Sequence, residues 1–233
     1  MTSFRAALGE FTCLTQGEGS GAGIGPQRLL WLPLIGLVAA LATLAIYLPL
    51  SWFYLPAEPA AVLGLMTVSC LRGFKAEAAF GHLADHVFGV SGPLRQESMP
   101  AAPGVTTLCG AFLLRFTILR FFFLPDSARL LAFGVIAGFL APMFARKGGS
   151  TGAHALGLIA LAATAALCVG ARSPVPGFPR FLPGPVFCTG LVYLASRLIY
   201  RIDGAEPWVS AASYPAELVG YTTFLLVRYH FLG

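Results

Sequence analysis

The sequence predicts an all-α, polytopic transmembrane helical bundle that forms a single integral membrane domain over residues 1–233. Hydrophobic residues make up 57% of the chain and charged residues only 11%, whereas a soluble domain is about 25% charged. The mean hydropathy is +0.77. The 17 prolines and 27 glycines suit membrane helices, which contain both residues more often than soluble helices do. A soluble enzyme and a disordered protein are therefore excluded.

The candidate membrane spans are the apolar stretches of the chain, because about 20 apolar residues cross the hydrocarbon layer of a bilayer. They are residues 29–52, 59–71, 101–124, 130–145, 153–171, 185–200 and 214–227. The stretch 29–52 carries no charge, whereas 59–71 is short and is expected to continue as a helix into the polar residues after it. Since several stretches are short, the sequence predicts about six to seven spans.

Two polar segments complete the predicted organisation. Residues 1–28 lack the basic start and apolar core of a secretory signal, so the first span is expected to act as its own insertion signal. The glycine-rich run 17–25 is predicted to be a linker, since no strand precedes it as a dinucleotide fingerprint requires. Residues 72–100 are expected to form an amphipathic helical segment outside the hydrocarbon layer.

The distribution of basic residues predicts the orientation. With the N-terminus inside, nine lysines and arginines lie on the cytoplasmic side and four on the other, with Arg115 and Arg120 between them. Because cytoplasmic loops are enriched in these residues, the N-terminus and residues 72–100 are predicted to be cytoplasmic. The net charge of +5 is small and scattered, so the expected environment is the lipid bilayer and no nucleic-acid partner is expected.

The cytoplasmic segment carries the first candidate site. Glu77 and Asp85 are eight residues apart, so they share one face of a helix, and His82 and His86 stack four residues apart. Carboxylates on one face at a membrane surface can hold Mg²⁺, which proteins bind through one or two carboxylates plus substrate phosphates. The alternative interpretation is a solvated amphipathic helix lying at the membrane interface.

Charged residues inside the apolar stretches form the second candidate group. Glu217 stands near the start of the last stretch, and Arg115 and Arg197 lie in two others. An ionisable side chain inside a span costs about 2.5–3.5 kcal/mol on insertion scales and usually has a partner or lines a pathway. Arg115 and Arg197 are the candidate partners of Glu217, although Arg197 can also snorkel to the interface.

Short motifs follow one another in an order known from one family of membrane enzymes. Residues 31–36 read WLPLIG and are similar to the FPLVG at that family's first span. Residues 73–77, GFKAE, and 82–85, HLAD, resemble the two halves of its GFHLDGLAD, with four residues inserted between them. In this order of motifs the chain resembles cobalamin synthase, or adenosylcobinamide-GDP ribazoletransferase, a polytopic enzyme of the inner membrane.

The resemblance continues through the second half of the chain, with some departures. Glu97 opens a stretch in the frame of the family's DSRxGTHG, Arg115 lies where the family carries a lysine, and Glu217 lies at the glutamate of TGDxxGAxxE. Phe88 replaces the last aspartate of the acidic motif, and Ser210 replaces the aspartate of the final motif. The chain is thus similar to a divergent member of the family.

The resemblance implies a transferase of late cobalamin biosynthesis in the cell inner membrane. In that family, α-ribazole or its 5′-phosphate attacks the phosphate of adenosylcobinamide-GDP and displaces GMP, and Mg²⁺ is required. The implied ligands of Mg²⁺ are Glu77 and Asp85, and the implied catalytic residues are Glu97, Glu217 and Arg115. Such chemistry needs cations that neutralise the diphosphate and carboxylates that hold them.

Two alternatives stay open at this stage. One is a catalytically degenerate relative that binds corrinoid or scaffolds other membrane proteins. The other is an unrelated small transporter, which would be expected to show broken spans in two similar halves. A homo-oligomer also stays open. An enzyme predicts that Glu77, Asp85, Glu97 and Glu217 converge on one cytoplasmic cavity, whereas the alternatives do not.

Overall fold

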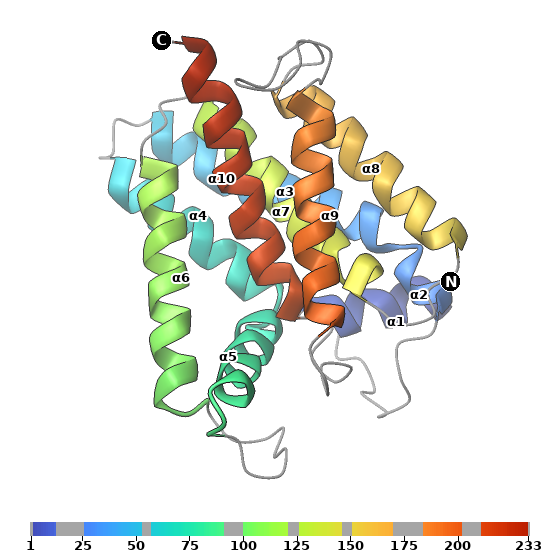
Figure 1. Cartoon of the computed structure of the whole chain (residues 1–233). Coiled ribbons are helices and arrows are strands. Elements are labelled where there is room, and N and C mark those ends of the chain that lie inside the picture. Colours follow the sequence, from blue (N-terminus) through green and yellow to red (C-terminus); the bar gives the residue numbers. More distant parts are fainter. Residues whose placement is uncertain are drawn as a thin grey trace.

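The computed structural model describes residues 2–12, 26–52, 57–90, 100–120, 126–145, 151–169, 184–201 and 211–232, and these parts are almost entirely helical (Figure 1). The all-α class is confirmed. The helices are α1 (Thr2–Phe11), α2 (Pro26–Leu29), α3 (Leu32–Trp52), α4 (Ala57–Leu71), α5 (Lys75–Val87), α6 (Ala102–Arg120), α7 (Asp126–Ala145), α8 (Thr151–Val169), α9 (Gly184–Tyr200) and α10 (Ser213–Leu232).

Four segments of the described chain are long and apolar enough to cross a membrane. They are Gln27–Leu50, Ala102–Arg120, Asp126–Ala145 and Thr151–Val169. The three other predicted stretches coincide with α4, α9 and α10, but α4 and α9 contain only 15 and 17 residues, fewer than the roughly 20 that a straight span needs. The chain is therefore a membrane protein built from apolar helices.

Helix α7 lies at the centre of the bundle, where it contacts α3, α8, α9 and α10 (Figure 1). In its apolar window 89% of the residues are buried, against 28% in α6 and in α8. Large side chains of the outer helices, such as Ile159 and Leu167 of α8, are exposed, as expected for surfaces that contact lipid. Two glycines of α7 let neighbours approach, because a Cβ at Gly134 would meet the ring of Tyr221 and a Cβ at Gly138 would meet the guanidinium of Arg72.

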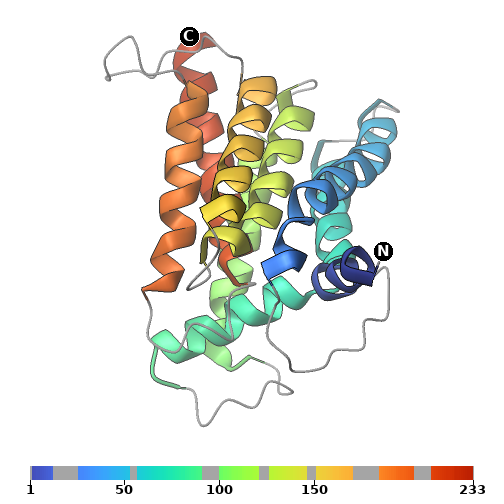
Figure 2. The ribbon, with the colours of Figure 1, turned by 90° about the vertical axis from the view of Figure 1, so that its right-hand side faces the viewer.

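Helices α1 and α5 lie across one end of the bundle rather than along it (Figure 2). The chain turns from α4 into α5 through Gly73 and Phe74, which both adopt left-handed backbone conformations with φ of 60° and 56°. Glycine tolerates this conformation and phenylalanine rarely does, so the turn is held by its surroundings. The amphipathic helix predicted in residues 72–100 is confirmed as α5, whose buried face includes Leu83 and Asp85.

Candidate functional site

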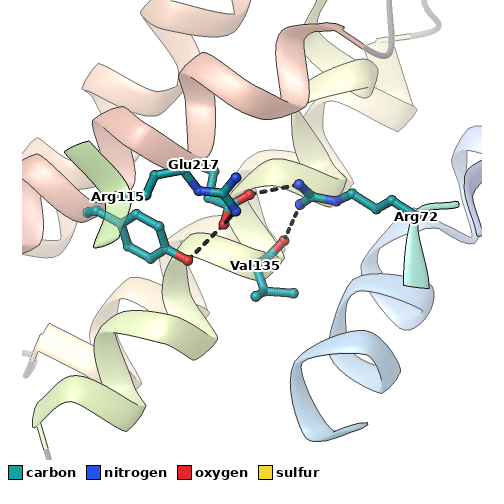
Figure 3. Close-up of polar contacts among 5 residues, drawn as sticks. Arg72, Arg115, Val135 and Glu217 are labelled. Carbon is teal, nitrogen blue, oxygen red and sulfur yellow. Dashed lines mark hydrogen bonds and ion pairs between the residues drawn. The ribbon is translucent and has the colours of Figure 1, made fainter. Parts of the chain in front are cut away.

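A buried network of charged side chains surrounds Glu217, which is 0% exposed in the second turn of α10. Its Oε2 accepts a hydrogen bond from Nη1 of Arg72 at 2.7 Å. Its Oε1 accepts hydrogen bonds from Nη2 of Arg115 and from the hydroxyl of Tyr221, the latter at 2.7 Å (Figure 3). We call Arg72, Arg115, Glu217 and Tyr221 the Glu217 network.

Three separate parts of the chain supply the Glu217 network. Arg72 lies in the turn between α4 and α5, Arg115 lies in α6, and Tyr221 follows Glu217 by one turn of α10. Arg72 also donates from Nη2 to the carbonyl oxygen of Val135 at 3.4 Å (Figure 3). The network therefore fastens α4, α6 and α10 to the central helix α7.

Of the two candidate partners predicted for Glu217, the structure pairs one with it. Arg115 pairs with it, but Arg197 donates instead to the carbonyl of Phe144 at 3.4 Å. Arg72, which the sequence places with the polar cytoplasmic segment, is only 2% exposed and is the second partner. The sequence did contain an indication that Arg72 is buried: it directly follows an apolar stretch, and its long side chain can reach back beside that helix.

Aromatic rings cover both arginines. The guanidinium of Arg115 lies 4.5 Å from the ring centre of Tyr214, and that of Arg72 lies 4.7 Å from the ring centre of Phe139. Such contacts stabilise a desolvated cation. Even so, Nε of Arg72 and Nε and Nη1 of Arg115 are buried without a hydrogen-bond partner in the described part of the chain. Buried donors are nearly always paired, so these three nitrogens are unusual.

Glu77 adds a second carboxylate to this region. It lies in the first turn of α5, and both of its carboxylate oxygens are buried without a hydrogen-bond partner among the described residues. Its charge lies within electrostatic range of Arg115 and Tyr214. One turn later, Phe80 stacks on the ring of Tyr214 with ring centres 5.1 Å apart. Helix α5 therefore closes one side of the site.

Asp85 is engaged differently from Glu77. It is 4% exposed, its Oδ2 accepts the backbone N–H of Ala101 at 2.6 Å, and its Oδ1 accepts that of Gly104 at 2.7 Å. The first N–H groups of a helix have no partner inside the helix, and a carboxylate there is further stabilised by the helix dipole. Asp85 thus caps α6 from α5. A Cβ at residue 104 would lie 2.9 Å from both of its oxygens, so the contact requires glycine.

The predicted magnesium ligands fit Mg²⁺ to different degrees. Glu77 offers two unpaired carboxylate oxygens, the ligand type that this hard cation prefers. Both oxygens of Asp85 already accept backbone hydrogen bonds. Within the described residues no group of three or more histidines, cysteines or acids is arranged to hold a metal ion. Glu97, the third acid predicted for the site, lies outside the described residues.

Fold and site together define the class: an all-α membrane protein with an arginine–carboxylate network inside its helical bundle. Comparisons with models of protein families, with curated proteins and with solved structures give no match. Arg72, Tyr214 and Tyr221 are members of the site that were not predicted from the sequence. The sequence did indicate a place for Tyr221 beside Glu217, because it follows Glu217 by four residues and so lies on the same face of the helix.

Proposed function

We propose that this protein is a membrane transferase of late cobalamin biosynthesis. It would join adenosylcobinamide-GDP and α-ribazole, or its 5′-phosphate, to give adenosylcobalamin, or its 5′-phosphate, and GMP. One observation carries the proposal: Arg115 pairs with Glu217 and lies within electrostatic range of Glu77, and the resemblance draws these three residues from three separate motifs.

The charges of the site suit a diphosphate substrate. Transfer of a phosphoryl group relies mainly on positioning and on neutralising negative charge. In this proposal Arg115 is the catalytic cation, because two of its nitrogens have no hydrogen-bond partner among the described residues. Glu217 is a positioning residue that holds both guanidinium groups in place. Glu97 is kept as a further candidate outside the described residues.

Magnesium is part of the same proposal. Glu77 would hold Mg²⁺ together with substrate phosphate oxygens, and the ion would neutralise charge on the diphosphate. Asp85 would join only by sharing an oxygen that now accepts a backbone hydrogen bond, so its capping of α6 is the better supported task. The substrates would reach the site from the cytoplasmic face of the inner membrane, with the N-terminus, α1 and α5 on that side.

A second candidate is a degenerate relative that binds corrinoid, or scaffolds other membrane proteins, without catalysis. The engagement of both Asp85 oxygens favours it, since a capping aspartate has less capacity left for a metal ion. The absence of two family aspartates, at Phe88 and Ser210, favours it further. Only the transferase forms a corrinoid product, so an experiment that detects this product distinguishes the two candidates.

The deciding experiment expresses the chain in a bacterial strain that lacks cobalamin synthase and supplies cobinamide. Growth, with corrinoid product in the extract, is expected for the native chain. Both growth and product should be lost in Glu77→Gln, because this variant keeps the shape of the side chain but loses its charge. The matched control is Glu58→Gln, because Glu58 is 42% exposed and pairs with the 60% exposed Arg120, away from the Glu217 network. If the native chain accumulates in the membrane but no corrinoid product forms, the proposed transferase activity is refuted and the degenerate relative remains.

A further inference from the structure

Three large apolar side chains are exposed where helix α5 ends. Val87, Phe88 and Val90 are 60%, 65% and 52% exposed, and we call these three residues the α5 tip. Earlier in the same helix the apolar residues Ala79 and Leu83 are buried. Single exposed apolar residues are common on protein surfaces, but three within four residues indicate a surface that contacts another molecule or a membrane.

The way in which α5 ends keeps the tip exposed. Gly89 has a φ of 70°, its N–H donates to the carbonyl of His86 at 3.1 Å, and the N–H of Val90 donates to the carbonyl of Asp85 at 3.0 Å. This is a Schellman ending, in which the residue after the glycine often packs on the last turns of the helix. One of the two positions that supply this contact is Asp85, whose carboxylate binds the start of α6 instead, and Val90 stays exposed.

The start of α6 gives the depth of the α5 tip. The helix Ala102–Arg120 is apolar enough to cross a membrane. Its length is about 28 Å, close to the ~30 Å of the hydrocarbon layer, so its first turn lies near one boundary of that layer. Asp85 caps this turn and thereby holds the end of α5 at the same level. The exposed face of α6, which includes Val105 and Leu113, continues from there into the membrane.

We propose that the α5 tip inserts into the boundary between the lipid headgroups and the acyl chains, beside the start of α6. Helix α5 lies across the end of the bundle (Figure 2), so it runs along the membrane surface, as interfacial amphipathic helices do. Because α5 also carries Glu77 and Phe80 at the Glu217 network, contact with lipid at its tip fixes the height of the helix that closes this site. This inference does not depend on the transfer reaction proposed above.

The test places a fluorescent side chain at the tip of the full-length protein. The three native tryptophans are replaced by phenylalanine, and Phe88→Trp puts an indole at an exposed position. The protein is reconstituted in phosphatidylcholine vesicles whose acyl chains carry bromine, a quencher of tryptophan, either near the headgroup or near the chain end. Leu113→Trp reports the lipid-facing side of α6. Ala78→Trp is the matched control, because Ala78 is exposed on α5 and lies about 2.5 turns before Val87, on the opposite side of the helix.

Bromine near the headgroup should quench Phe88→Trp about twofold more than Ala78→Trp, and bromine near the chain end should quench Leu113→Trp most, because these positions lie at different depths. Equal quenching of Phe88→Trp and Ala78→Trp by the brominated lipids would overturn the proposal. Acrylamide, a quencher dissolved in water, then identifies what surrounds the tip: water if it quenches Phe88→Trp, and protein, such as a second copy of the chain, if it does not.

A second measurement keeps the native tryptophans. Amide hydrogen exchange of residues 84–90 in vesicles should accelerate about three- to tenfold in Phe88→Ser, because the ring no longer contributes apolar burial in the lipid. It should change less than about twofold in Ala78→Ser, since a substitution on the exposed polar side of α5 removes no such contact. Equal exchange in Phe88→Ser and in the native chain would show that the tip does not anchor α5.

Discussion

Arg72 and Glu217 form a buried ion pair of 2.7 Å although 145 positions separate them in the sequence. The pair joins the turn after α4 to α10, and Arg115 from α6 contacts the other oxygen of the same carboxylate. Taking charges out of water is costly unless they are paired and hydrogen-bonded. The network therefore constrains how these helices pack, since any other arrangement would leave a buried charge alone.

Removal of the acid tests this constraint. Glu217→Gln leaves two desolvated guanidinium groups with a weak partner, and loss of one member of a buried pair costs about 3–5 kcal/mol. We expect a large fall in folded protein recovered from membranes and a lower unfolding midpoint. A second change, Arg115→Met, should restore part of both, because it removes one of the unpaired charges. An unfolding midpoint equal to that of the native chain would mean that the network contributes nothing to stability.

Asp85 should matter for stability before it matters for chemistry. Asp85→Asn keeps one acceptor oxygen, and Asp85→Ala keeps none, so unfolding free energy should fall by about 1–3 kcal/mol, more in the alanine variant. Amide hydrogen exchange should accelerate at both Ala101 and Gly104 in the alanine variant, and at one of the two in the asparagine variant, because asparagine keeps a single acceptor oxygen. Asp126→Asn is the control, because its contact with Arg129 is solvent-exposed. Unchanged exchange would show that Asp85 does not cap α6.

The glycines of α7 are expected to be intolerant of a methyl group. Gly138→Ala places a Cβ against the guanidinium of Arg72 and 3.1 Å from the carbonyl oxygen of Ser213, and Gly134→Ala places one against Tyr221. Overpacking of this kind costs about 1–3 kcal/mol, measured as a lower unfolding midpoint. Gly190→Ala on α9 is the matched control, because nothing lies within 4 Å of its added Cβ. Equal midpoints for all three variants would contradict the packing described for α7.

The orientation can be tested with reporter fusions. Reporters after residues 146–147 and after Arg201 are expected to be cytoplasmic, and reporters near Glu58 and Pro176 periplasmic, because short basic loops favour the cytoplasm. Glu58 contacts Arg120, so the start of α4 and the end of α6 lie at the same end of the bundle. Reversal at any two of the four positions would refute the cytoplasmic N-terminus and the cytoplasmic placement of α5.

Composition and periodicity alone determined the class of this protein. The scarcity of charge and the long apolar stretches predict membrane helices, and the spacing of residues 75–87 predicts an amphipathic helix, because both properties depend only on residues near one another in the chain. The same local reasoning marked Glu217 and Arg115 as charges that need a partner. The free-energy cost of placing a charged side chain inside a membrane span depends on that residue itself, so it can be estimated from the sequence.

The tertiary structure alone decided which partners those charges have. Arg72 reads locally as the basic end of an apolar stretch, and only the tertiary fold, which brings α7 and α10 beside the turn after α4, buries it beside Glu217. Asp85 and Glu77 read as equivalent acids on one helix face, yet α6 starts beside Asp85 and leaves Glu77 without a hydrogen bond among the described residues. The depth and neighbours of a polar side chain depend on where distant helices meet, and no local pattern encodes that meeting point.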